Sequence, residues 1–173
     1  MRGIWQARQY KKRTIIIGGL SIVLVIGAII TGIAIHAANN NKTTETMILD
    51  PGYTTVLPAD KTITSLGGWK RVSPKNASPV YAYNDTIAGT AISVSEQTLP
   101  ESFQSDVNGS IADLAKAYNA TATTQVGDTI VYIGTSAQGP QSVIFAKNGL
   151  LILIKSEKQI TNTAWSSYAV SLQ

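Results

Sequence analysis

The chain has 173 residues, 44% of them hydrophobic, with 14 cationic side chains against 10 acidic ones. This length allows one domain of ordinary size. The net charge of +4 is unevenly placed, because five cations precede residue 14 and every acid lies at or after Glu45. Residues 39–173 carry nine cations and ten acids, a net charge of −1. A nearly neutral domain lacks the basic patch that binds nucleic acid, so no nucleic-acid partner is expected.

The chain contains no cysteine. Disulfides, thiol nucleophiles, thiolate metal sites and a lipid-modified cysteine are therefore excluded. A small domain exposed outside a eukaryotic cell often depends on disulfides, because its core is limited. Their absence favours a bacterial source.

Residues 14–37 form an apolar segment without a permanent charge. As a helix this segment would rise about 36 Å, enough to cross the roughly 30 Å hydrocarbon layer of a bilayer with some tilt. The cations that precede it favour a cytoplasmic N-terminus. The sequence thus predicts a basic cytoplasmic tail (1–13) and one transmembrane helix (14–37), with the rest of the chain outside the plasma membrane.

A cleaved signal peptide is the alternative interpretation of this segment. Signal peptides have apolar cores of about 7 to 15 residues and need small residues at the cleavage site. Here the apolar run is longer, and cleavage after Ala37 or Ala38 would place Ile35 or His36 where a small residue is required. An uncleaved anchor is therefore favoured.

A polar spacer is predicted over residues 38–60, followed by one domain over 61–173. Two β-prone runs, Val80–Tyr83 and Thr90–Ser95, are separated by turn residues at Asn84-Asp85 and Gly89. In the second run, apolar Ile92 and Val94 alternate with Ser93 and Ser95, which is typical of a half-buried strand. A helix is predicted over 110–118 from its apolar spacing, with Ser110 and Asp113 approximating a capping box.

Three further strands are predicted in the C-terminal half, over 129–133, 142–146 and 150–154. Residues 134–140 are expected to form a loop, whereas Asn148-Gly149 is the strongest short signal for a tight hairpin turn. Residues 150–154 are apolar at every position, so both faces of that strand should be covered.

The chain closes with a predicted helix, which has its N-cap at Thr161 or Asn162. The residues with helical apolar spacing are Trp165, Tyr168, Ala169 and Leu172. The fold class predicted is α+β: an antiparallel sheet of about five strands with two packed helices, preceded by one transmembrane helix.

No catalytic, cofactor-binding or metal-binding residue is predicted. The only histidine, His36, lies in the predicted span, which excludes a Ser-His-Asp triad and a histidine metal site in the domain. No lysine follows a serine at the Ser-x-x-Lys spacing. A carboxylate-based hydrolase needs only two acids, but Glu96 and Glu101 are expected to be solvated side chains in a surface loop. The sequence therefore predicts a protein that is not an enzyme and has no cofactor.

The stretch Gly-Trp-Lys-Arg-Val-Ser-Pro at residues 68–74 and the closing strand–Asn-Gly–strand–helix portion carry a resemblance. Residues 68–173 resemble a group of bacterial single-pass membrane proteins with a small extracytoplasmic α+β domain, whose function is uncharacterised. The closing strand–Asn-Gly–strand–helix portion also weakly resembles the outer domain of some anti-sigma-type regulators. The resemblance implies the fold and topology and supplies no site residue.

The function predicted is that of a membrane-anchored extracytoplasmic binding or scaffold module of the bacterial cell envelope. Its partners would be the lipid bilayer, through residues 14–37, and an envelope protein, with no small-molecule ligand. The candidate partner-binding loop contains Thr135, Ser136 and Gln138, because long exposed loops commonly carry binding residues. The alternatives are the ectodomain of an envelope signalling or secretion complex and a carboxylate-based envelope hydrolase.

Overall fold

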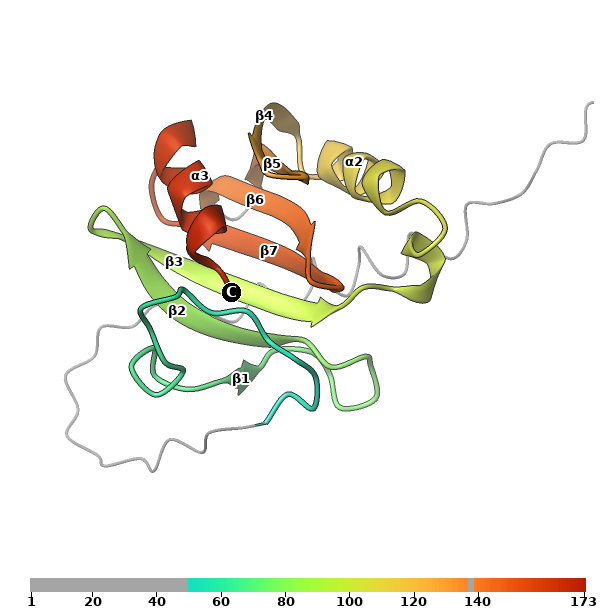
Figure 1. Ribbon diagram of the computed structural model, residues 1–173, viewed down its shortest axis with the longest axis vertical. Coiled ribbons are helices and arrows are strands. Elements are labelled where there is room, and N and C mark those ends of the chain that lie inside the picture. Colours follow the sequence, from blue (N-terminus) through green and yellow to red (C-terminus); the bar gives the residue numbers. More distant parts are fainter. Residues whose placement is uncertain (1–49, 137–138) are drawn as a thin grey trace, which may run out of the picture.

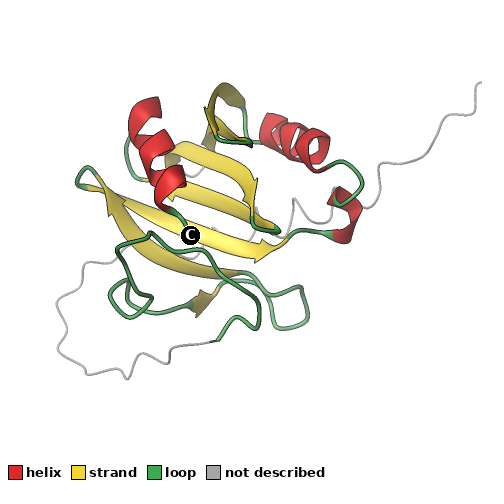
Figure 2. Cartoon of the chain, in the orientation of Figure 1, coloured by secondary structure: helices red, strands yellow, loops and turns green. Residues whose placement is uncertain are grey.

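The computed structural model describes residues 50–136 and 139–173, which form a sheet with helices on both of its faces (Figures 1 and 2). The elements are β1 (Lys70–Arg71), β2 (Tyr81–Ile87), β3 (Thr90–Thr98), the 3-10 helix η2 (Glu101–Phe103), α2 (Val107–Ala117), β4 (Ala120–Val126), β5 (Thr129–Ser136), β6 (Gly139–Lys147), β7 (Leu150–Ser156) and α3 (Asn162–Ser171). All neighbouring strands are antiparallel, in the order β1-β2-β3-β7-β6-β5-β4.

The predicted α+β class, with an antiparallel sheet and two packed α-helices, is confirmed. The described sheet has seven strands where about five were predicted. The additional strands are the two-residue β1 and the strand β4. The predicted membrane span at 14–37 lies outside the described residues. Within 50–136 and 139–173, no helix is long and apolar enough to cross a bilayer.

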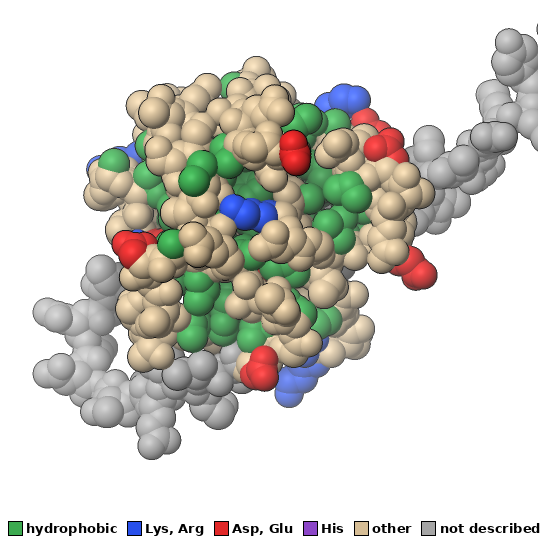
Figure 3. All heavy atoms as spheres, in the orientation of Figure 1, with side chains coloured by type: hydrophobic (Ala, Val, Ile, Leu, Met, Phe, Trp, Pro, Cys, Tyr) green, Lys and Arg blue, Asp and Glu red, His purple; other side chains and the backbone are tan. Residues whose placement is uncertain are grey.

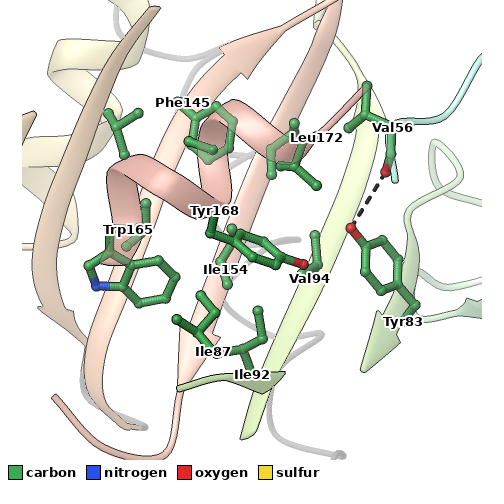
Figure 4. Close-up of a cluster of buried hydrophobic side chains, with 14 of the residues drawn as sticks. Val56, Tyr83, Ile87, Ile92, Val94, Phe145, Ile154, Trp165, Tyr168 and Leu172 are labelled. Carbon is green, nitrogen blue, oxygen red and sulfur yellow. Dashed lines mark hydrogen bonds between the residues drawn. The ribbon is translucent and has the colours of Figure 1, made fainter. Parts of the chain in front are cut away.

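One face of the sheet is covered by α3 together with the segment that precedes β1. Trp165 and Tyr168 of α3, with Leu172 at its C-cap, point towards the sheet (Figure 4). The preceding segment contributes Val56, which is 0% exposed, and Trp69 to the same core. The apolar spacing of the closing helix therefore identified its buried side correctly, and Thr161 is its N-cap, accepting a hydrogen bond from the Ala164 amide.

The other face carries a second, smaller core beneath α2. Ile111, Leu114 and Ala115 of α2 pack there with side chains from β6 and β7. Because Leu151 and Leu153 belong to this core while Ile152 and Ile154 belong to the first, β7 is covered on both faces, as predicted. The hairpin before β7 is also confirmed, since Asn148 (φ +50°) and Gly149 (φ +75°) both have positive φ.

The first hairpin turns later than its sequence suggested. β2 continues through Asn84 and Asp85 to Ile87, and the turn is made by Ala88 and Gly89, both with positive φ. The prediction of a turn at Asn84-Asp85 is therefore wrong. The Asp85 side chain is buried, where it accepts hydrogen bonds from Lys61, Tyr168 and the Thr86 amide. These partners satisfy the carboxylate within a strand.

The helix α2 begins one turn earlier than predicted. Its N-cap is Asp106, whose Oδ1 accepts a 2.9 Å hydrogen bond from the Gly109 amide. Ser110 lies inside the helix, so the proposed capping box at Ser110 and Asp113 is wrong. Asp113 instead forms an exposed ion pair with Lys116.

The segment before β1 is bound to the C-terminal end of the chain. We call residues 53–59 the strap. Leu57 and Gln173 exchange backbone hydrogen bonds of 3.0 and 2.8 Å, and the Ala59 amide donates to the carbonyl of Ser171. Pro58 forms a β-bridge with Leu172. The packed part of the chain thus includes residues that the sequence placed in the spacer (38–60).

Candidate functional site

The predicted binding loop at 134–140 is largely strand. β5 extends to Ser136 and β6 begins at Gly139, so only residues 137–138 separate the two strands in the sequence. Thr135 is exposed, Ser136 ends β5, and Gln138 lies outside the described residues. Thr135 and Ser136 thus belong to a strand and not to a long loop.

Gly134 is part of β5, and its close packing explains why a glycine is required there. A Cβ atom at Gly134 would lie 2.5 Å from the carbonyl oxygen of Tyr118 and 2.7 Å from the amide nitrogen of Ala120. Those atoms belong to the backbone that follows α2 and cannot move aside cheaply. A larger residue at Gly134 would therefore disturb the packing of β5.

Glu96 was expected to be a solvated loop residue, and this prediction is wrong. Glu96 lies in β3 and is 0% exposed. Its Oε2 accepts a 3.2 Å hydrogen bond from the Val56 amide, whereas its Oε1 has no partner among the described residues. The hydroxyl of Tyr53 donates to the backbone carbonyl of Glu96 at 2.8 Å. The strap therefore covers this carboxyl group completely.

Burial raises the pKa of Glu96 to about 8, and the hydrogen bond from Val56 opposes this only in part. The side chain is consequently protonated at neutral pH. A protonated carboxyl group is the form that a general acid needs, but a general acid must also reach its substrate. Glu96 is sealed beneath the strap, while Glu101 is exposed in η2. The pair considered for a carboxylate hydrolase therefore does not face one site.

A different group of side chains forms the surface that best fits a partner. These residues, which we call the polar face, project from β2, β3 and β7: Asn84, Thr86, Ser93, Ser95 and Lys155. Ser95 is opposite Leu153 of the α2-side core, so Ser95 lies on the α2 side of the sheet. Because side chains alternate along a strand, Ser93 and Lys155 lie on that side too.

The register aligns the polar face across the sheet. Asn84 is opposite Ser93, Ser93 is opposite Lys155, and Lys155 is opposite Ser142 of β6. Directly opposed residues have Cβ atoms about 5 Å apart, so these side chains form one continuous row. The α2 helix packs against β4, β5 and β6, which leaves β2 and β3 without that cover (Figure 1).

Lys155 is the only charged member of the polar face and is half-buried. Desolvation lowers its pKa to about 8. Ser142 beside it is 2% exposed, and its Oγ has no hydrogen-bond partner among the described residues. A Ser–Lys catalytic pair would require a hydrogen bond between the hydroxyl and the amine, which Ser142 does not make. The row can therefore bind polar groups, but it lacks the geometry of a nucleophile and its base.

The sequence contains a local signal for part of the polar face. Ser93 and Ser95 alternate with Ile92 and Val94, which predicts a strand with one buried and one polar side. That the polar side belongs to a surface shared with β2 and β7 depends on the strand order, which local patterns do not contain. On the opposite, α3-bearing side, charged side chains are few and scattered (Figure 3).

No cluster of residues able to hold a metal ion occurs within 50–136 and 139–173. Comparisons of the chain with protein-family models, with curated proteins and with solved structures find no match.

Proposed function

We propose that this chain is a membrane-anchored binding module of the bacterial cell envelope, with residues 14–37 spanning the plasma membrane and the α+β domain outside. The observation that carries the binding role is the polar face, an aligned row of polar side chains that lies mainly on β2 and β3, which α2 does not cover. Short hydroxyl and amide side chains of this kind can form hydrogen bonds with a partner.

The chemistry of the polar face favours a partner with polar groups. Its members offer hydroxyl and amide groups for hydrogen bonds, and the half-buried Lys155 is the one charged residue among them. Among the described residues, the one exposed large hydrophobic side chain is Val170, on α3. A domain that inserts into lipid would present several such side chains, so a protein or cell-wall partner fits this surface better than a lipid.

Site-specific photocrosslinking in the producing cells tests the binding role. A photoreactive amino acid introduced at Ser95, on the polar face, should give a discrete adduct that Lys155→Met weakens. The matched control places the same amino acid at Asn148, which is exposed in the β6–β7 turn. Identical adducts from both positions, or an adduct at Ser95 that ignores Lys155→Met, would contradict the binding role.

The membrane topology has its own test. A reporter that works only outside the cytoplasm should be active when fused after Gln173, because the cations before residue 14 favour a cytoplasmic N-terminus. Activity of a cytoplasm-only reporter at that position would overturn the predicted topology. It would not bear on the binding role of the polar face, which the crosslinking experiment tests.

A further inference from the structure

The two edges of the sheet differ in how they are protected. β1, at one edge, has only two residues, Lys70 and Arg71, and both are cationic. The Arg71 guanidinium also donates to carbonyl groups of the loop that follows, including those of Pro74 and Ala77. Short length and positive charge are the usual features that stop an edge strand from pairing with another chain.

β4, at the other edge, is longer and uncharged, although its pairing with β5 shifts register between Ala120 and Ala122. It is seven residues long, with the sequence Ala-Thr-Ala-Thr-Thr-Gln-Val, and contains neither a charged residue nor a proline. In the described part of the chain β4 pairs only with β5, so its outer backbone groups have no strand beside them. Three of its side chains, Thr121, Thr123 and Gln125, are exposed.

The helix above β4 adds a second observation. Ser166 of α3 shares a 2.7 Å hydrogen bond with Thr124 of β4, which places this side of α3 over the edge strand. Val170 follows Ser166 by four residues and therefore lies on the same side of the helix. At 60% exposure, Val170 is the one large hydrophobic side chain exposed among the described residues. An uncharged edge strand and an exposed valine thus occur together.

From these observations we propose that β4 pairs antiparallel with β4 of a second copy of this chain, joining two sheets into one. An antiparallel register centred on Thr123 places that residue opposite its own copy and Thr121 opposite Gln125. No pair in that register contains a charge, so no like-charge repulsion opposes it. A two-fold interface of this kind uses the same surface on both copies. This interface is separate from the polar face and does not depend on it.

The absence of cysteine makes the register directly testable in the full chain, in whichever cell fraction contains it. Under a mild oxidant, Thr123→Cys should give a disulfide-linked dimer, because the two copies of residue 123 face each other across the pair. Thr121→Cys alone should give none, since its two copies would be about 14 Å apart along the strands. Thr121→Cys combined with Gln125→Cys should restore the dimer.

Two further variants decide between β4 pairing and chance contact. Lys70→Cys places an exposed cysteine on the opposite edge and should not crosslink. Adding Thr123→Lys to the Thr121→Cys, Gln125→Cys variant should lower the dimer yield about fivefold, because two ammonium groups then face each other. Equal yields from Lys70→Cys and Thr123→Cys would overturn the proposal. The proposal would also be overturned if neither the Thr123→Cys variant nor the Thr121→Cys, Gln125→Cys variant formed a dimer. That result would be expected, for example, if a different protein paired with β4.

Discussion

Glu96 is the side chain whose environment differs most from its expected one. A buried carboxyl group is usually paired with a cation or deprotonates at a cost in stability. No ion pair to Glu96 occurs within the described residues, and the side chains around it include Tyr53 of the strap and Tyr81 and Tyr83 of β2. Keeping its proton is the way this residue avoids a buried, unpaired charge.

This environment predicts a pH-dependent stability. The pKa of Glu96 is about 8 in the folded domain and about 4.5 as an ordinary carboxyl group. Between these values the unfolded chain has lost the proton and the folded domain retains it, so the free energy of unfolding decreases as pH rises. The expected slope is on the order of 1 kcal/mol per pH unit. Urea unfolding of residues 50–173 between pH 5 and 8 measures it.

Glu96→Gln is the matched control for that experiment. The amide oxygen of glutamine can still accept the hydrogen bond from the Val56 amide, but the side chain does not titrate. The pH-dependent decrease should become markedly smaller in this variant. An unchanged slope would show that other groups produce it.

Gly134 and Gly149 each require a glycine, but for different structural reasons. Gly149 needs a positive φ, and a Cβ atom there would meet nothing within 4 Å. A Cβ atom added at position 134 would collide with backbone atoms of Tyr118 and Ala120. We therefore expect Gly134→Ala to lower the free energy of unfolding by about 3 kcal/mol and Gly149→Ala by about 1 kcal/mol. Thermal melts of the two variants measure these losses, and a larger loss for Gly149→Ala would indicate that residues 134–136 form a loop. As a control, Thr135→Ala changes an exposed side chain and should keep the free energy of unfolding within about 0.5 kcal/mol of wild type.

At the scale of single elements, α2 offers a direct comparison between two possible caps. Asp106 accepts a hydrogen bond from the Gly109 amide, whereas Ser110 lies within the helix. Asp106→Ala should therefore cost about 1 kcal/mol of stability, and Ser110→Ala should cost much less. Chemical unfolding of the two variants measures both values. A larger loss at Ser110 would place the start of the helix where the sequence pattern suggested.

Elements with local signals were predictable, and those that depend on distant partners were not. The Asn148-Gly149 turn could be predicted from the residues of one hairpin. The closing helix could be predicted from the apolar spacing over three helical turns. β4 was missed because its Ala and Thr residues have no strong apolar alternation, and it is a strand because β5 pairs with it. The burial of Glu96 depends on Val56, 40 residues earlier in the chain.

The same limit applies to the candidate site. Local patterning identified Ser93 and Ser95 as the polar side of a strand, yet the surface they form requires Lys155 from the far end of the domain. The loop at 134–140 was favoured because its Gly, Ser and Pro residues are common in turns. Those residues also fit a strand that must pass close to other backbone, and only the packed structure distinguishes the two cases.

For the whole molecule, the strap determines where the stable unit begins. Val56 is fully buried, and Leu57 pairs with the backbone of Gln173. A fragment that starts at residue 61 loses both contacts and leaves Glu96 without its hydrogen bond from the strap. We expect residues 61–173 to be less stable than residues 50–173 by at least about 2 kcal/mol, since burying one valine side chain contributes about that much.

Urea unfolding of the two fragments at pH 6 measures this difference, at a pH where Glu96 is protonated in the folded state. Val56→Ala in the 50–173 fragment is the matched control, and it should account for about 1 to 2 kcal/mol of the loss, because it removes buried methyl groups while leaving the backbone hydrogen bonds. The remainder reports the strap's attachment to the C-terminal residues. Equal stability of the two fragments would mean that the strap contributes nothing to the free energy of unfolding. The segment 38–60 would then serve as a spacer along its whole length.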